Sequence, residues 1–510
     1  MAMMSRLIGV RSGRSGRQVE RDALRVAAAL RSLGVAAGDR VLFSSDNHEE
    51  YLTVVLAAAH LDTSLFLVDH RRTVAEKQRL AERARVRWTI SDSQADVEAG
   101  IGGTILPLDA LAPADCPRPL ADGLSWDAWR RRPDAMLLSS SGSTGEPKII
   151  AKSGRAFLDN LERTRKLMGY TEGDVLLPIL PFSHQYGLSI AVLAWISGAS
   201  LVVGPYRRLD QVAEVAGSAE ATITDATPAT YRSLLNLLDY RPALRECFRA
   251  VRMWCTGGAP LDRALARRFR AELGAPVLDG YGSSEAGNVA FATPDNPVAC
   301  GRLLDGVRVA IRDERGEDVL PGQVGELWLD TPDLMSGYLD DAGELTPTAP
   351  GEYPTHDLGY WDPEGNLHVL GRKFAVHRLG HTLYPEAIER RAEECGRPVR
   401  IVALDDERRG SSLVFVVEDA EGSPAQRWRR EFSAILPSFE QPNHVVVVPR
   451  FPLNGNGKPD AHRLRELVLR ELATSARRAP SVPSPRFGSP EQPVRRPEPA
   501  GRAEPDSQET

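Results

Sequence analysis

The 510-residue sequence predicts an α/β protein with a large N-terminal domain of mixed β-sheets flanked by helices, a β-rich subdomain, and a small α+β C-terminal domain. Three observations lead to this fold class: helical periodicity alternates with short buried strands up to about residue 300, short strands separated by turns follow, and a second strand–helix series closes the chain. The length exceeds what one ordinary core accommodates. The formal charge of −6 gives no electrostatic basis for a nucleic-acid partner.

The first part of the chain alternates strands with helices, which is typical of βαβ units and a largely parallel sheet. Expected helices span 18–33, 49–59, 155–168 and 229–238, and expected strands span 40–43, 65–68, 175–177, 201–203, 221–224 and 251–256. The uncharged stretch 188–203 is short for a membrane span and is broken by Ser197, Gly198 and Ser200. It predicts a buried helix, a turn and a strand. With no signal-peptide core at the N-terminus, we expect a cytoplasmic protein with no membrane partner.

The later part divides into three segments. Strands at 307–313, 325–330 and 367–370, separated by turns, predict the β-rich subdomain that closes a large domain over 1–371. Helices at 385–394 and 425–436 and strands at 399–403, 413–417 and 444–448 predict a small domain over 372–472. Residues 473–510 are Pro-, Arg- and Glu-rich with few apolar side chains, and predict a disordered tail.

The segment 138–148, LSSSGSTGEPK, combines glycines, hydroxyl residues and a lysine after a hydrophobic strand. Its backbone N–H groups and hydroxyls can surround phosphate oxygens while Lys148 supplies positive charge. It is not a Walker A loop, because Pro147 precedes the lysine and Ile149 follows it. Taken alone, the pattern also fits a flexible Ser/Gly loop. The candidate phosphate-binding residues are Ser140, Ser141, Gly142, Ser143, Thr144, Gly145 and Lys148.

The segment 279–285, DGYGSSE, forms a Gly-rich turn after an apolar strand. Tyr281 could stack on a base, and Glu285 is a natural ligand for magnesium near phosphates. A surface turn with a solvated glutamate is the alternative.

Two more segments carry charged residues that are candidates for the site. Asp357, in YPTHDLGY, could accept hydrogen bonds from ribose hydroxyls, and Arg372 follows in a Gly-Arg pair. Lys458 lies in the Gly/Asn loop PLNGNGK, where it could meet a developing charge or simply face solvent.

Together, SSGSTGEPK, YGSSE, HDLGY, GRK and NGNGK resemble, in order and separation, the core motifs of the acyl-adenylate-forming superfamily. This superfamily includes acyl-CoA ligases, luciferases and the adenylation domains of nonribosomal peptide synthesis. The resemblance covers about residues 18–468. It implies a mobile small domain and a two-step reaction, in which a carboxylate attacks the α-phosphate of MgATP and a thiol then attacks the acyl-adenylate.

The resemblance also implies a role for each matching residue. Residues 140–148 would hold the β- and γ-phosphates, Ser284 would contact the α-phosphate, and Glu285 would bind Mg²⁺. Lys458 would act as the catalytic lysine between the substrate carboxylate and the α-phosphate. The hinge would be Lys373 or Phe374, with Lys373 preferred. The residues implied at the AMP site are Gly258, Tyr281, Gly282, Ser283, Ser284, Asp357 and Arg372.

Three positions depart from the family pattern. Ile149 replaces a glycine that usually follows the lysine, His356 replaces a glycine before Asp357, and His377 stands where a lysine is common. These changes lie near the face used in thioester formation, so they bear on CoA use more than on adenylation.

The acyl pocket implied by the resemblance involves His184, Asp225, Gly257 and Gly282, with His184 also as a catalytic candidate. Asp225 follows a buried strand, where a carboxylate is costly without a partner, and a substrate ammonium would be such a partner. Capping of the next helix or solvent exposure is the alternative. We expect a stand-alone enzyme of secondary metabolism, such as antibiotic biosynthesis, that loads an amino acid, and among these a β-amino acid, onto the phosphopantetheine thiol of a carrier protein. The alternative is an acyl- or aryl-CoA ligase.

Overall fold

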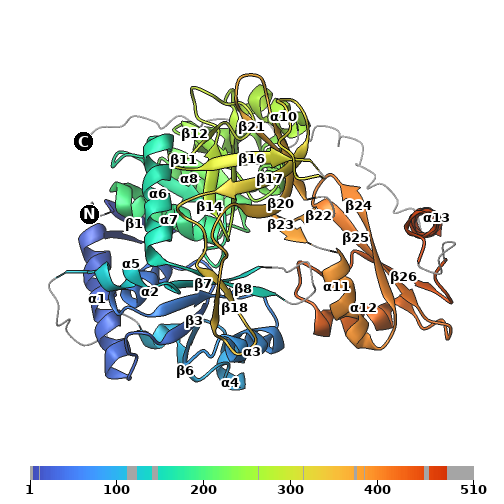
Figure 1. Cartoon of the computed structure of the whole chain (residues 1–510), viewed down its shortest axis with the longest axis horizontal. Helices are drawn as coiled ribbons and strands as arrows, with labels where there is room; N and C mark the ends of the chain where they lie inside the picture. The colour runs from blue at the N-terminus through green and yellow to red at the C-terminus, as the bar shows by residue number, and fades with distance from the viewer. Residues whose placement is uncertain are drawn as a thin grey trace, which may run out of the picture.

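The computed structural model describes residues 4–10, 12–111, 123–140, 147–261, 263–313, 315–372, 376–383, 385–452 and 459–478. Within them the fold is mixed α/β, as the sequence predicts: two large sheets and a smaller four-stranded sheet form the body, and a compact unit from about residue 376 onward lies beside it (Figure 1). No described helix is long and apolar enough to cross a membrane.

One large sheet carries the Ser/Gly-rich segment. Its strands are ordered β19 (Leu345–Pro347), β18 (Gly337–Leu339), β8 (Lys148–Lys152), β7 (Met136–Ser140), β4 (Ser64–Leu67), β3 (Arg40–Ser44), β5 (Trp88–Ser91) and β6 (Thr104–Pro107). Strands β7, β4, β3, β5 and β6 are parallel, whereas β8 runs antiparallel to both β7 and β18. The hairpin of β7 and β8 therefore places the Ser/Gly-rich loop at the carboxyl end of a parallel strand.

The other large sheet carries the second motif. Its order is β15 (Arg302–Leu303), β14 (Gly287–Phe291), β13 (Val277–Ser283), β12 (Met253–Thr256), β11 (Ile223–Ala226), β9 (Val175–Pro178), β10 (Ser200–Val202), β1 (Arg6–Ile8) and β2 (Gly13–Ser15). The strands from β13 to β1 are parallel, so the residues that follow β11, β12 and β13 emerge along one edge. That edge is where ligands bind in open α/β sheets.

The helices of the large domain are α1 (Gly16–Ser32), α2 (Glu49–His60), α3 (Val74–Arg83), α4 (Gln94–Ala99), α5 (Asp127–Arg131), α6 (Gly154–Met168), α7 (Gln185–Ser197), α8 (Leu209–Ser218), α9 (Pro228–Tyr240) and α10 (Arg263–Leu273). Three of them, α4, α6 and α7, end at a glycine in the left-handed conformation. Helix α7 is buried almost all round and ends at Gly198, in the left-handed conformation, before β10. The helix, turn and strand expected for 188–203 are confirmed.

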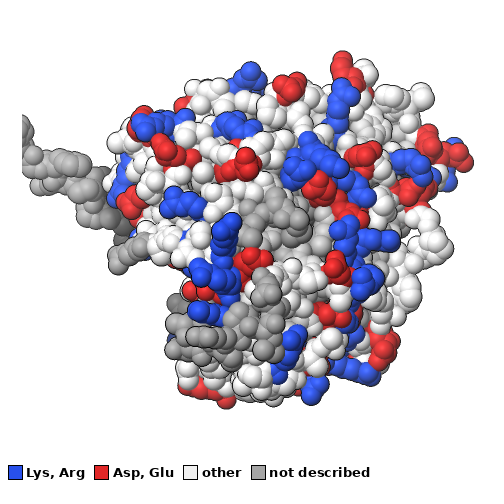
Figure 2. All heavy atoms as spheres, turned by 90° about the vertical axis from the view of Figure 1, so that its left-hand side faces the viewer, with Lys and Arg blue, Asp and Glu red and all other residues white. Residues whose placement is uncertain are grey.

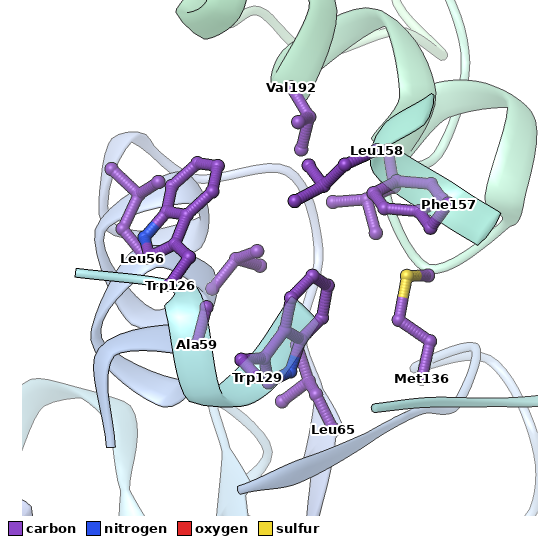
Figure 3. Close-up of a pocket in the computed structure, with 11 residues that line it drawn as sticks. Leu56, Ala59, Leu65, Trp126, Trp129, Met136, Phe157, Leu158 and Val192 are labelled. Atoms are coloured by element: carbon purple, nitrogen blue, oxygen red, sulfur yellow. The ribbon is translucent and has the colours of Figure 1, made fainter. Parts of the chain in front are cut away.

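A small apolar cavity lies between α2, α5, α6 and α7 (Figure 3). Side chains from these helices and from β4 and β7 point toward one another around it, with the rings of Trp126 and Trp129 among them. It is lined by Val55, Leu56, Ala59, Leu65, Trp126, Trp129, Met136, Phe157, Leu158, Leu188 and Val192. None of these residues carries a charge, so the cavity is a packing gap of the core.

The β-rich subdomain is a four-stranded antiparallel sheet of β16 (Arg308–Arg312), β17 (Gly325–Asp330), β20 (Tyr353–Trp361) and β21 (Leu367–Arg372). The small unit contains β22 (Val376–Arg378), β23 (His381–Leu383), β24 (Val399–Asp406), β25 (Gly410–Glu418) and β26 (His444–Val448), with α11 (Pro385–Ala392), α12 (Ala425–Ile435) and α13 (Ala461–Arg478). Its core is separate, centred on Phe415, Trp428 and Phe432.

The expectation that disorder begins at residue 473 is wrong for its first residues, because α13 continues to Arg478. Leu472 packs partly against a second apolar cluster of the small unit, which includes Val416 and Phe451, and the following residues include good helix formers. The remainder of the predicted tail, 479–510, lies outside the described residues.

Basic and acidic side chains are interspersed over the face of the molecule shown in Figure 2. Neighbouring charges therefore compensate one another on that face.

Candidate functional site

The hairpin of β7 and β8 positions the phosphate-binding candidates. Ser140 and Lys148 are paired across it, and the Lys148 ammonium lies 5.1 Å from the centre of the Tyr338 ring, a cation–π contact. The loop between them, with Ser141, Gly142, Ser143, Thr144 and Gly145, lies outside the described residues. So do Lys373 and Lys458, and only the backbone of Arg372 is described.

Three AMP-site candidates from distant parts of the chain meet at one place. Tyr281 donates its hydroxyl hydrogen to Asp357 Oδ2 at 2.7 Å, and Asp357 is paired with Arg372 across β20 and β21. The three predicted residues are thus neighbours, although 76 positions separate the first two. His356, which replaces the family's glycine here, has a φ of +61°, the left-handed region that favours glycine.

The glycines of the candidate site allow close approach of backbone. A Cβ on Gly282 would lie 2.6 Å from the carbonyl oxygen of Gly287, so the hairpin of β13 and β14 requires glycine there. A Cβ on Gly257 would lie 3.3 Å from the Tyr186 ring, which packs against it. Gly258 has a φ of +77°. These positions shape the site through the backbone.

Glu285 lies in the turn between β13 and β14 and is 8% exposed. Its carbonyl oxygen accepts hydrogen bonds from the Met335 N–H at 2.7 Å and from Lys152 Nζ at 3.2 Å. Its carboxylate has no hydrogen-bond or ion-pair partner among the described residues. A largely buried carboxylate of this kind fits a divalent cation, with the remaining ligands supplied by phosphate oxygens and water. The described part of the chain contains no ready-made cluster of three metal-ligating side chains.

Asp225 lies within β11, one residue before its end, and is 2% exposed. Its Oδ1 accepts a hydrogen bond from the Tyr186 hydroxyl at 3.0 Å, and its Oδ2 is buried with no hydrogen-bond partner among the described residues. Burial raises the pKa of Asp225 to about 7, against the opposing effect of the Tyr186 hydrogen bond. Both alternatives left open by the sequence are excluded, because the carboxylate does not face solvent and Thr227 caps α9.

The start of α7 connects these parts. Gln185 Nε2 donates to the Ser283 carbonyl oxygen at 3.3 Å, while its Oε1 is buried and has no hydrogen-bond partner in the part of the chain that the structure describes. Tyr186 reaches Asp225, and His184, with a side chain 43% exposed, places Nε2 3.3 Å from Asp69 Oδ2. One helix terminus therefore contacts the ends of β11, β13 and β4.

Asp69 lies two residues after β4 and binds the side chains of Arg71 and His184. Arg71 donates two side-chain hydrogen bonds to it, at 3.0 and 2.7 Å. Burial opposes ionisation, but the hydrogen bonds from His184 and Arg71 outweigh it and hold the pKa of Asp69 well below its usual range. The carboxylate is therefore ionised, and it accepts a hydrogen bond from the Nε2–H group of His184.

The small unit contacts Arg71 and His184 through His381. Arg71 Nη2 lies 2.9 Å from His381 Nε2, and the His381 ring stacks on Phe439 at 4.1 Å between centres. Because a guanidinium has no acceptor, it donates to Nε2, so His381 is neutral with its proton on Nδ1. Burial lowers the pKa of His381 well below the usual value, which agrees with this assignment. The His184 and His381 rings meet edge to face at 5.5 Å.

A second ion-pair cluster joins the two units. Arg391 on α11 lies 3.3 Å from Glu76 on α3 and 2.5 Å from Glu440, and all three side chains are largely buried.

Sequence reasoning missed Asp69, Arg71, Lys152, Tyr186 and His381. Asp69 could have been found as a carboxylate at the carboxyl end of a buried strand. Lys152 had a signal too, since it ends the otherwise apolar run of β8. The contact between Arg71 and His381 joins residues 310 positions apart, and nothing in the local sequence marks it.

Comparison with known proteins agrees with this geometry. Residues 6–339 match the AMP-binding enzyme family. Pyochelin synthase PchD from Pseudomonas aeruginosa (strain UCBPP-PA14) is 29% identical over 487 residues, covering 89% of this chain and 87% of that protein. Fatty acid–[acyl-carrier-protein] ligase ScoC from Streptomyces coeruleorubidus is 27% identical, covering 88% and 90%. A structure of o-succinylbenzoate CoA synthetase (MenE) from Bacillus subtilis has a TM-score of 0.79 at 22% identity, covering 91% of this chain and 96% of that one. The chain therefore belongs to the AMP-binding enzyme family, and it is an ATP-dependent, AMP-forming ligase of the acyl-adenylate-forming superfamily.

Proposed function

We propose that the protein activates an amino acid, specifically a β-amino acid, as its acyl-adenylate and transfers the acyl group to the phosphopantetheine thiol of a carrier protein in secondary metabolism. The observation that carries the proposal is the buried Oδ2 of Asp225, which has no hydrogen-bond partner among the residues described by the structure. A carboxylate in that position costs folding free energy, and a substrate ammonium would offset the cost by forming an ion pair. The names of PchD and ScoC, a pyochelin synthase and an acyl-carrier-protein ligase, support the biosynthetic setting.

The position of Asp225 distinguishes this pocket from the kind of pocket in which an aspartate at the start of α7 binds the substrate ammonium. The residues that begin α7 are His184 and Gln185, which carry no negative charge, whereas Asp225 comes from the neighbouring strand β11. Tyr186 fixes one carboxylate oxygen and leaves the other for the ligand. This arrangement favours an amine held away from the position of an α-ammonium group.

In the first half-reaction, the substrate carboxylate attacks the α-phosphate of ATP and pyrophosphate leaves. Lys148 and the loop before it would bind the β- and γ-phosphates, and Lys458 would stabilise the charge that builds between the two anions. Glu285 would hold Mg²⁺, which neutralises phosphate charge. Asp357 would bind the ribose hydroxyls next to Tyr281, and in the second half-reaction the thiol displaces AMP from the acyl carbon.

An acyl- or aryl-CoA ligase is the second candidate, and the pKa of Asp225 favours it in one respect. With a pKa near 7, the side chain is partly protonated at neutral pH and can donate a hydrogen bond to an uncharged polar acid. His184 would then line a neutral pocket, and CoA would be the acceptor.

The test is ATP–pyrophosphate exchange with α-amino, β-amino, aryl and fatty acids, using the wild type and D225N. We expect strong exchange with a β-amino acid and its loss in D225N, while any exchange with neutral acids is retained. Asp279 is a matched control, because it is a buried carboxylate whose pKa burial also raises to about 7. D279N should change exchange with all acids alike. Exchange by the wild type with fatty or aryl acids alone would favour the CoA ligase, and unaltered β-amino acid kinetics in D225N would exclude the ammonium site.

A further inference from the structure

Lys152 is a fully buried lysine at the end of β8. Its Nζ donates to two backbone carbonyl oxygens, of Glu285 at 3.2 Å and Ser284 at 3.5 Å. No carboxylate of the described residues lies within ion-pair distance of it. Burial lowers its pKa to about 8, opposed by the negative charges of Asp333 and Glu285. A buried ammonium that binds only carbonyl groups is costly to the fold, which indicates a role beyond packing.

The two carbonyl groups belong to one turn. Ser284 and Glu285 lie between β13 and β14, and they are the residues proposed to contact the α-phosphate and Mg²⁺. The Met335 N–H also donates to the Glu285 carbonyl oxygen, so this oxygen accepts two hydrogen bonds. Lys152 therefore ties this turn to β8, the strand that begins with Lys148.

Lys148 and Lys152 are four residues apart on one strand. Because side chains alternate between the two faces of a strand, both belong to the same face of β8. Lys148 follows the candidate phosphate-binding loop, and Lys152 contacts the Ser284–Glu285 turn. The strand thus sets the spacing between the two halves of the nucleotide site.

We propose that Lys152 is a positioning residue for the metal-assisted half-reaction, holding the Ser284–Glu285 turn so that the Glu285 carboxylate meets the cation at the phosphates. This inference rests on the proposed function of Glu285. Groups that orient a metal ligand typically change metal affinity by about 10- to 100-fold when removed, so the same range is expected here. The positive charge of Lys152 by itself would repel a metal ion. Loss of the lysine would therefore tighten metal binding if charge, rather than position, dominated.

The test compares K152M, K152Q and the wild type, with K166M as a control for loss of an exposed lysine on α6. Mn²⁺ binding in the presence of α,β-methylene-ATP is measured by electron paramagnetic resonance, and binding of the same nucleotide without metal by calorimetry. We expect K152M to weaken Mn²⁺ binding at least about tenfold with little effect on metal-free nucleotide binding. K152Q keeps an N–H donor and should recover part of the affinity.

Equal or tighter Mn²⁺ binding in K152M, or equal loss of nucleotide binding with and without metal, would overturn the inference. If K152M does not fold, as judged by thermal unfolding, the comparison of K152Q with the wild type decides it. A wild type that binds no Mn²⁺–nucleotide would instead refute the role of Glu285.

Discussion

Compared with the wild type, D225N should be more stable at alkaline pH and less stable at acid pH. The pKa of Asp225 is raised from 3.8 to about 7 by burial. Between these values the folded protein keeps a proton that the unfolded chain has released. Raising the pH therefore favours the unfolded state until the folded carboxyl ionises near pH 7, and asparagine does not take part in this equilibrium.

The size of the effect follows from the shift. A difference of about three pKa units corresponds to about 4 kcal/mol at pH values above 7. About 3 kcal/mol of this develops between about pH 4.5 and pH 8. The asparagine amide keeps an acceptor for Tyr186 but adds buried N–H groups without partners, which costs about 1–3 kcal/mol at every pH. Because this cost does not depend on pH, it cancels when the difference in unfolding free energy between D225N and the wild type is compared at two pH values.

Urea unfolding of the wild type and D225N at about pH 4.5 and pH 8 measures this difference in unfolding free energy. The difference in unfolding free energy should move in favour of D225N by about 3 kcal/mol from acid to alkaline pH. D210N is the control, since Asp210 is exposed and its pKa is lowered rather than raised by Arg208. A pH-independent difference for D225N would show that Asp225 is ionised in the folded state throughout, and the argument for a buried carboxyl awaiting a cation would be refuted.

Three other substitutions test separate parts of the structure. R391M leaves the buried carboxylate of Glu440 unpaired at the contact of the two units, so small-angle scattering should show a larger radius of gyration, and an unchanged profile would contradict a stabilising role. V192I adds a methylene at the apolar cavity and should raise the unfolding free energy by up to about 1 kcal/mol, whereas V212I, in a packed region without the cavity, should lower it. K458A should slow adenylation on the order of 10²–10³-fold and spare thiolysis of a pre-made adenylate, and an equal loss of both would contradict this division.

Periodicity predicted most of the elements well, because their buried residues recur at the spacing of a helix or a strand within a short stretch of sequence. The expected strand 444–448 coincides with β26, and the expected helix 155–168 differs from α6 by one residue. The strand β20, by contrast, was not predicted as a strand, and its segment was singled out only for the motif around Asp357, because polar residues occur on both of its faces. Alternation of apolar and polar residues is a weak guide where a strand carries a binding motif.

The candidate site was predictable where a motif is continuous in sequence, as for Tyr281 and Glu285. It was not predictable where the contacts are tertiary. Asp225 stood out as a carboxylate after a buried strand, but only the structure reveals that Tyr186 satisfies one of its oxygens and leaves the other without a partner. Lys152 is similar, because its importance lies in which two carbonyl groups it reaches.

The hydrogen bond from Arg71 to His381 makes this imidazole a reporter of the arrangement of the two units. While the contact holds, the proton is confined to Nδ1, and ¹⁵N chemical shifts of the ring distinguish that tautomer from the other. If the small unit turns away from the large one, the restriction is lifted and the ring nitrogens should approach the values of a solvated histidine. A single labelled residue would then give the fraction of molecules in each arrangement during turnover, without any attached probe.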